Sequence, residues 1–368
     1  MTDPRAPLRL LFDGHTFDAG PQGTTTFLAG LLNALPAAAA PRAIEIHCAA
    51  ASQDAVDRFV KTPYRYHAMR GGFARRNLIE LPRISAEVNP DFIVSQYVRP
   101  FRGQGRKAAV IHDVLFMDYP HLFSRSYRLL RKTLFGWSAR HSDLVLTVSD
   151  YSAQRIAHHF GIDQAAIAIV PNAVEVAPAE VQPETARSAG FELLYVSRFE
   201  ARKRQDWCIR AAEQLHREGL PVRLTLVGAP EGAYGAHILD MAAAADVPVE
   251  CLHGISNARI AQLYRDADLS LFPSECEGFG IPVIEAAALG TPCTVADNSA
   301  LSELREHYAG DTFATDDFEG FLSAIRTGLN GREELRRRAA ITAPGVREFY
   351  RWDRMAGLFL AAIEGRHR

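Results

Sequence analysis

The sequence has no apolar run of the ~18 residues that a membrane-spanning helix needs. Its five cysteines are scattered without a close pair, which argues against a disulfide framework or a zinc site. Residues 1–7 are polar and lead straight into a strand-like run, so no secretory signal is expected. These absences predict a soluble, intracellular protein whose thiols are reduced.

Lysine is also scarce. The chain has only four lysines, and Lys203 is the only one after position 132. The remaining composition is ordinary, with 48% hydrophobic and 23% charged residues, which excludes global disorder. The length of 368 residues predicts two domains, since domains usually hold ~100–200 residues.

Although the net charge is only −2, basic and acidic residues are unevenly distributed along the chain. Residues 61–140 carry 15 basic and 5 acidic side chains, and residues 176–368 carry 21 basic and 28 acidic ones. A basic region of this kind can meet phosphate, lipid head groups or nucleic acid. The alternative is a solvated helix face.

Short apolar runs alternate with helical stretches, and most runs are continuous, as in strands covered on both faces. The expected strands are 8–13, 43–49, 92–95, 108–112, 143–148, 166–170, 191–197, 222–228, 249–254, 268–272 and 292–296. The expected helices are 24–35, 126–141, 149–160, 206–218, 257–266 and 282–289. Repeated strand–helix–strand units predict an α/β protein with parallel, doubly wound sheets.

The alternation of strands and helices is broken at residues 173–189, which contain two prolines and show no hydrophobic periodicity. This segment is therefore predicted to be a linker. The expected domains are 1–172 and 190–348. Ligands of open α/β sheets bind beyond the carboxyl ends of the strands. Two such sheets facing each other would place a site in the cleft between domains.

The segment 273–285 carries the strongest signal for a ligand site. It joins an expected strand to a helix beginning near Ile281, where Pro282 suits the first turn. A helix N-terminus attracts anions, and Gly278 and Gly280 would let a ligand approach the backbone closely.

Two carboxylates of this segment, Glu277 and Glu285, lie eight residues apart. Facing a phosphate they would repel it, so they are better suited to accept hydrogen bonds from hydroxyl groups, as an acid does on a ribose. The alternative is a capped helix with two solvated acids.

Three further segments follow expected strands. Arg198, Arg202 and Lys203 form a basic run after 191–197, suited to phosphate or to a plain basic surface. His112 ends another strand, where it would either contact a substrate or serve as a structural capping residue. The turn at 20–25 lacks the full Gly-x-Gly-x-x-Gly spacing, so it supports dinucleotide binding only weakly.

Metal chemistry is not predicted. Asp266-Ala267-Asp268 matches an Asp-x-Asp metal motif, but it precedes a strand instead of following one. No His, Cys or Asp cluster has metal-ligand spacing, and the sequence has no Walker loop.

Residues 249–303 resemble the nucleotide-binding half of the retaining family 4 glycosyltransferases, which have the two-domain GT-B fold. The family pattern Pro-Ser-x-x-Glu-Gly-Phe-Gly-x-Pro-x-x-Glu-Ala is matched throughout 273–286. Further matches are Gly254, 263–268, 290–292, 302–303, Arg198, 202–203, 112–113, 147–149, 170–172 and 23–35. Thr25 departs from the family, because many members have a second glycine there.

The resemblance implies two Rossmann-like domains facing across a cleft, with a helix over 349–368 packed back on the amino-terminal domain. It also implies a metal-independent, retaining transfer from a nucleotide-diphosphate sugar, with no cofactor. Arg198 and Lys203 would neutralise the leaving diphosphate, and Glu285 would hold ribose hydroxyls. Attack by the acceptor on the same face would retain the configuration.

The donor sugar would be held by Glu277 and by the backbone of Gly278, Phe279, Gly280 and Ile281. From the amino-terminal domain, His112 would contact the sugar, and Gly23 and Thr24 would lie near the phosphates. Ile255 would border the base. The catalytic set is therefore His112, Glu277, Arg198 and Lys203.

The expected acceptor is a saccharide, lipid-diphosphate-linked or soluble, in bacterial envelope polysaccharide assembly. The basic region 61–140 would then meet the inner face of the plasma membrane. Nucleic acid is not expected as a partner. Two other functions remain open: another GT-B enzyme, such as a nucleotide-sugar epimerase, and a non-catalytic nucleotide-sugar-binding protein.

Overall fold

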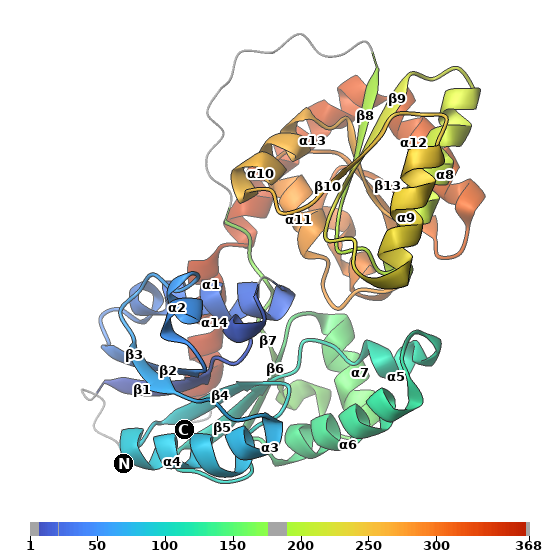
Figure 1. Cartoon of the computed structure of the whole chain (residues 1–368). Helices are drawn as coiled ribbons and strands as arrows, with labels where there is room; N and C mark the ends of the chain where they lie inside the picture. The colour runs from blue at the N-terminus through green and yellow to red at the C-terminus, as the bar shows by residue number, and fades with distance from the viewer. Residues whose placement is uncertain (1–6, 21, 176–189, 366–368) are drawn as a thin grey trace. The chain divides into compact units, whose positions relative to one another are not determined.

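The computed structural model describes residues 7–20, 22–175 and 190–365 (Figure 1). The chain divides into two compact units, 1–173 with 350–368, and 174–349. Most of the expected linker, 176–189, lies outside the described residues. No helix in the described ranges is long and apolar enough to cross a membrane.

The first unit is built on a seven-stranded parallel sheet of order β3-β2-β1-β4-β5-β6-β7. Its strands are β1 (Leu8–Asp13), β2 (Ile44–Ala50), β3 (Arg65–Ala68), β4 (Phe92–Gln96), β5 (Arg106–Val110), β6 (Leu144–Thr147) and β7 (Ile167–Ile169). The α-helices between them are α1 (Gly23–Ala39), α2 (Gln53–Asp57), α3 (Phe73–Arg75), α4 (Leu81–Val88), α5 (Leu115–Asp118), α6 (Arg125–His141) and α7 (Asp150–Phe160). A π-helical turn, Arg76–Glu80, joins α3 to α4.

The last helix of the chain, α14 (Trp352–Gly365), packs against α1 in this first unit (Figure 1). The contact depends on a small residue in α1. A Cβ atom built on Gly30 would lie 2.0 Å from the Trp352 ring, so any side chain there would displace the indole.

The second unit has a six-stranded parallel sheet of order β10-β9-β8-β11-β12-β13. The strands are β8 (Phe191–Val196), β9 (Val222–Val227), β10 (Val249–Leu252), β11 (Leu269–Phe272), β12 (Cys293–Asp297) and β13 (Gly310–Ala314). The helices are α8 (Gln205–Arg217), α9 (Gly232–Ala244), α10 (Asn257–Asp266), α11 (Ile281–Ala288), α12 (Phe318–Asn330) and α13 (Arg332–Phe349).

The predicted architecture of two parallel α/β units is confirmed. The sequence analysis did not predict the edge strands β3 and β13, or the helices α4, α9, α12 and α13. Both strands are short and largely exposed or half-buried, so they lack the continuous apolar run that marks the central strands.

Asp268 belongs to the fold, consistent with the rejection of the Asp-x-Asp motif as a metal site. Its buried carboxylate accepts a hydrogen bond from the Glu192 N–H at 2.9 Å and lies 3.1 Å from the Arg336 guanidinium. The side chain therefore anchors the start of β11 to α13.

Candidate functional site

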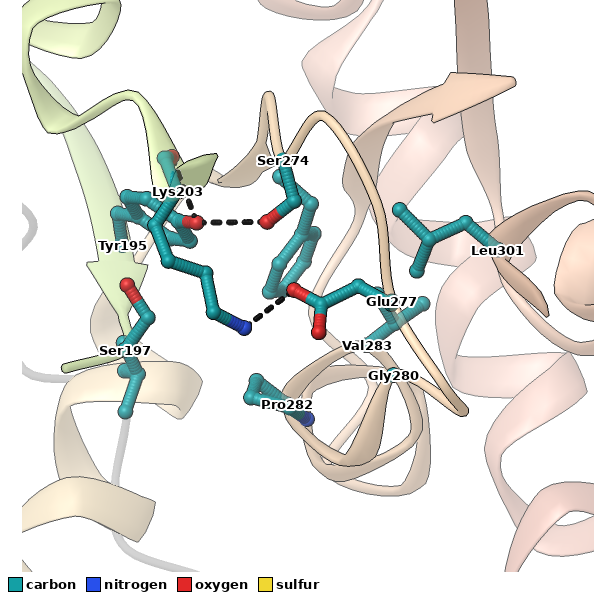
Figure 2. Close-up of a pocket in the computed structure, with 11 residues that line it drawn as sticks. Tyr195, Ser197, Lys203, Ser274, Glu277, Gly280, Pro282, Val283 and Leu301 are labelled. Atoms are coloured by element: carbon teal, nitrogen blue, oxygen red, sulfur yellow. Dashed lines mark hydrogen bonds and ion pairs between the residues drawn. The ribbon is translucent and has the colours of Figure 1, made fainter. Parts of the chain in front are cut away.

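The residues at the carboxyl ends of β8 and β11 form a pocket in the second unit (Figure 2). These strands are neighbours in the sheet, so the loops that follow them lie side by side. The lining residues include Tyr195, Ser197, Lys203, Ser274, Glu277, Gly280, Pro282 and Leu301. The helix α11 begins at this pocket, and its N-terminal dipole adds a positive potential.

The turn into α11 requires glycine. Gly280 precedes the helix with a φ of 105°, in the left-handed region that residues with a side chain rarely adopt. A Cβ atom there would also lie 2.8 Å from the Leu301 side chain. The family-like Gly-Phe-Gly spacing thus serves the local backbone, and Pro282 occupies the first turn as predicted.

A buried ion pair lies at the centre of the pocket. The Lys203 ammonium donates to the Glu277 carboxylate, and the two side chains are only 11% and 14% exposed (Figure 2). Arg202 approaches the same carboxylate at 3.3 Å and donates to the Cys276 carbonyl at 2.9 Å.

The two loops are joined independently of this pair. The Tyr195 hydroxyl, buried on β8, lies 2.9 Å from the Lys203 carbonyl and 2.9 Å from the Ser274 hydroxyl. On the other side, the Ser299 hydroxyl accepts from the Glu277 N–H at 2.9 Å. Both members of the ion pair are therefore held by their backbones as well as by each other.

The electrostatics favour an ionised Glu277. Burial by itself would raise the pKa of this carboxyl, but Lys203 and Arg202 outweigh it and hold the pKa at about 2. Burial lowers the pKa of Lys203, and Glu277 opposes that shift.

Arg198 lies outside this centre. Its guanidinium is 59% exposed and pairs with Glu200 at 2.8 Å, and Glu200 in turn pairs with Arg202 at 2.8 Å. Glu200 thus links Arg198 to the buried pair. Of the two arginines, Arg202 contacts Glu277 directly. The phosphate contact predicted for Arg198 stays a prediction.

Glu285 lies on α11 beside Tyr264 of α10, whose hydroxyl is 3.4 Å from the carboxylate. Burial raises the pKa of Glu285 to about 7, and the Tyr264 hydrogen bond only partly opposes this. Near neutral pH the group is therefore available in both protonation states, and it can exchange hydrogen bonds with hydroxyl groups.

Three predicted donor residues, Gly278, Phe279 and Ile281, belong to the same loop and helix start as Gly280. Ile255 follows β10 and Gly254, whose φ is 66°, and is half-buried just before α10. It does not line the pocket around Lys203 and Glu277.

The other three predicted residues belong to the first unit. His112 follows β5 and is buried, with its Nε2 atom 2.6 Å from Gln96 Oε1 and its ring edge-on to Phe27. Burial lowers the pKa of His112 to about 3. The imidazole is therefore neutral at physiological pH, which favours a hydrogen-bonding role over charge stabilisation.

Gly23 and Thr24 begin α1. The loop before them is fastened by Thr25, the residue that replaces the second glycine of the family. Its buried hydroxyl lies 3.0 Å from the Thr16 carbonyl and 2.9 Å from the Gly20 carbonyl. The departure from the family thus stabilises the loop locally.

The sequence analysis missed the residues that support the site. Tyr264 lies in the family-like stretch 263–268, but the sequence analysis gave it no role beside Glu285. Ser299 is distant in sequence from Glu277, and the sequence analysis did not single it out. Tyr195 and Ser274 lie within the segments that were singled out, but only the pairing of β8 with β11 brings their hydroxyl groups together.

Comparison with known proteins agrees with this geometry. The model of "Glycosyltransferase Family 4" matches residues 21–177, and that of "Glycosyl transferases group 1" matches residues 178–344. The two sheets and their loops define the architecture of a GT-B glycosyltransferase. The chain belongs to glycosyltransferase family 4.

Several curated relatives are similar over part of their length. Glycogen synthase of Mycobacterium tuberculosis is 28% identical over 237 residues, 62% of this chain and 57% of that protein. A D-inositol 3-phosphate glycosyltransferase of Actinosynnema mirum is 32% identical over 60% of this chain and 57% of its own. The matched region thus spans little more than half the length of these relatives.

Solved structures share the fold over nearly the whole chain. Sucrose-phosphate synthase from Thermosynechococcus elongatus has a TM-score of 0.77 at 18% identity, covering 98% of this chain and 99% of its own. HepE from Anabaena, solved in complex with UDP-glucose, has a TM-score of 0.75 at 16% identity, covering 97% and 100%.

The ion pair makes a pH-dependent contribution to stability. Glu277 has a pKa of about 2 in the folded protein, below the usual value of 4.5 for a glutamate, so its ionised form stabilises the fold above pH 4.5. The contribution is lost as the pH falls through about 2. We expect Glu277→Gln to lower the free energy of unfolding by about 3 kcal/mol at pH 7.

Urea unfolding at a series of pH values measures this difference. It should shrink between pH 4.5 and 2, where wild-type Glu277 becomes protonated. Glu250→Gln, on the exposed side of β10, is the matched control and should change little. Equal stability of Glu277→Gln and wild type at pH 7 would contradict the ion-pair assignment.

Proposed function

We propose that the protein is a metal-independent, retaining glycosyltransferase that moves a hexose-type sugar from a nucleotide-diphosphate sugar to a saccharide acceptor. The observation that carries this proposal is the buried Lys203–Glu277 pair beside the start of α11. A fixed cation next to a helix N-terminus suits a leaving diphosphate. A fixed carboxylate beside it suits the hydroxyl groups of a sugar.

The pair does not prevent Lys203 from binding an anion. An ammonium group has three N–H donors, and Glu277 Oε1 takes one of them. A diphosphate can therefore share the ammonium with Glu277. The chain's own cations, Lys203 with Arg202 and Arg198, would then stabilise the departing charge and perform the task of a metal ion.

Glu285 and the neutral His112 complete the proposed mechanism as hydrogen-bonding groups. Glu285, held by Tyr264, would bind ribose hydroxyls, and His112 would bind the donor sugar through a hydrogen bond. In this proposal Gly23 and Thr24 lie near the donor phosphates, Ile255 borders the base, and no cofactor takes part.

The relatives suggest which donors to test. One curated relative, 31% identical over 50% of this chain, is named a GDP-mannose-dependent mannosyltransferase of Mycobacterium tuberculosis. The Anabaena neighbour binds UDP-glucose. The donor panel should therefore include UDP-, GDP- and ADP-sugars.

We expect one of these donors to raise the thermal unfolding midpoint, because a ligand at 100 times its dissociation constant adds about 2.7 kcal/mol. Lys203→Ala should then reduce turnover with that donor by ~10²–10³. Lys61→Ala, an exposed lysine of the first unit, is the matched control. If Lys203→Ala melts like the wild type and its turnover stays within a few-fold of wild type, Lys203 has no part in the mechanism.

The product should keep the anomeric configuration of the donor, and transfer should continue in EDTA. The first expectation follows from the resemblance of the segment from Glu277 to Glu285 to retaining enzymes. The second follows from stabilisation of the leaving group by Arg198 and Lys203. NMR of the isolated product measures the configuration. An inverted linkage, or activity lost in EDTA and restored by Mg²⁺ or Mn²⁺, would overturn the mechanism. Donor turnover without an acceptor would favour an epimerase, and donor binding without turnover a binding protein.

The acceptor in this proposal is a saccharide of bacterial envelope polysaccharide assembly, carried on a lipid diphosphate. The protein would then work in the cytoplasm, at the inner face of the plasma membrane. One face of the first unit supports membrane contact. Leu129 and Leu130 on α6 are 70% and 60% exposed, and Leu78 and Ile79 in the π-helical turn are 52% and 60% exposed.

These four residues are here called the apolar patch. The segments that carry them, the π-helical turn before α4 and the helix α6, are drawn on the same side of the sheet in Figure 1. Phe101 links the two segments: its N–H donates to the Asn77 carbonyl at 3.2 Å, and its ring lies 4.6 Å from that of Trp137 on α6. Exposed basic residues flank the patch, namely Arg70, Arg75, Arg125 and Lys132.

We expect the protein to sediment with phosphatidylglycerol vesicles at low salt and to be released at high salt. Arg70→Glu with Arg75→Glu should weaken binding at least about 10-fold, since each basic residue contributes ~1 kcal/mol. Arg76 is left intact because it pairs with buried Asp13. The control is the double variant Arg217→Glu with Arg223→Glu, in the second unit. If both double variants bind the vesicles equally well, the patch does not bind the membrane and is only a solvated surface.

A further inference from the structure

The end of β1 carries a histidine–carboxylate pair that the proposed donor site does not use. The Nδ1 atom of His15 lies 2.9 Å from Oδ1 of Asp13, the last residue of the strand. Asp13 is fully buried, whereas the His15 side chain is 29% exposed. Among the described residues, no hydrogen bond engages the other ring nitrogen, Nε2 of His15.

The backbone fixes the geometry of this pair. Gly14, between the two residues, donates to the Ala49 carbonyl at 2.8 Å, and a Cβ atom on it would lie 2.6 Å from the Cys48 sulfur. The His15 N–H also points to Asp13 Oδ1 at 3.3 Å. The loop therefore holds the imidazole against the carboxylate with little freedom.

A third residue sets the charge of the pair. The Arg76 guanidinium, only 12% exposed, lies 3.4 Å from the other carboxylate oxygen, Oδ2 of Asp13. Burial would raise the pKa of Asp13, but His15 and Arg76 together lower it. An ionised carboxylate only accepts hydrogen bonds, so the proton of a neutral His15 must reside on Nδ1. The lone pair of Nε2 is then available to accept a hydrogen bond.

The Asp13–His15 pair lies at the part of the sheet where ligands usually bind in this fold class. β1 lies between β2 and β4 in the strand order, so β1 and β4 flank the point where the order reverses. Open α/β sheets bind ligands beyond the strand ends at this point. The neighbouring strand β4 ends at Gln96, whose buried Nε2 has no hydrogen-bond partner among the described residues.

We propose that the Asp13–His15 pair binds the acceptor, with Nε2 of His15 accepting a hydrogen bond from a hydroxyl group of a saccharide or polyol. Asp13 acts as the positioning residue that selects the tautomer, as a buried aspartate does for other substrate-facing histidines. This inference rests on the proposed function, because it assigns the acceptor side of the same reaction.

The charge balance favours a hydroxyl group over a phosphate as the bound group. The Arg76 guanidinium lies against the buried Asp13 carboxylate, so its positive charge is already compensated. The lone pair of an imidazole nitrogen attracts an O–H donor and repels a phosphate oxygen. The anionic part of a lipid-linked acceptor would have to bind elsewhere.

The first test is kinetic and uses the donor found by the thermal screen, with a panel of free hexoses, methyl glycosides and myo-inositol as acceptor probes. His15→Ala should lower kcat/KM for the acceptor by about 10- to 100-fold, the range for loss of one buried hydrogen bond. The dissociation constant of the donor should stay at its wild-type value. The thermal midpoint should fall, because His15 also bonds the buried Asp13 carboxylate, but the protein should remain folded at the assay temperature. His158→Ala, an exposed histidine on α7, is the matched control.

An acceptor kcat/KM within two-fold of wild type for His15→Ala would overturn the inference while leaving the proposed function intact. An equal loss of donor affinity would also overturn it, because His15 would then belong to the donor site or to the fold. Failure of the wild-type protein to transfer any sugar would overturn the proposed function, and the inference with it.

The second test reads the tautomer directly and needs no activity. Long-range ¹H–¹⁵N correlation spectra of the labelled full chain at pH 8, with His15 assigned by its absence in His15→Ala, should show Nδ1 protonated and Nε2 bare. Asp13→Asn should shift the population toward the Nε2–H form. A His15 ring that is mainly Nε2–H in the wild type would overturn the assignment of Asp13 as the positioning residue.

Discussion

The ion pair between Lys203 and Glu277 is the interaction on which the second unit's pocket depends. Removing two charges from water is costly, and a buried pair is tolerated only with good geometry and additional hydrogen bonds. Here the Tyr195 hydroxyl bonds the Lys203 carbonyl and the Ser274 hydroxyl, and the Ser299 hydroxyl accepts from the Glu277 N–H. The pair therefore keeps a cation and a carboxylate in place at the start of α11 before any ligand binds.

The first unit also has a buried carboxylate with a basic partner, formed by different residues. Asp13 is buried at a strand end, where it lies within hydrogen-bond distance of His15 and pairs with Arg76. In both units a parallel strand delivers a carboxylate to the carboxyl edge of the sheet, where the backbone and a basic partner hold it. Such preorganised polar groups need little rearrangement when a ligand replaces water.

The fold was predictable because its central strands are buried on both faces and appear in the sequence as continuous apolar runs. β1 is the clearest example, since the expected and observed bounds are both 8–13. The edge strand β3, Arg-Tyr-His-Ala, is covered on one side only by β2 and carries no such run. The loop 273–280 was predictable as a site because its glycines, proline and glutamates each have a strong local preference.

The sequence by itself determined the two α/β units, the ligand loop before α11 and the candidate residues along it. The tertiary structure decided which charges meet. It joined Lys203 to Glu277 across 74 positions, and it set Arg202 rather than Arg198 against that carboxylate. It also paired Arg76 with Asp13. Local sequence encodes backbone preference and burial, whereas ion pairing depends on which strand ends the parallel sheet places side by side.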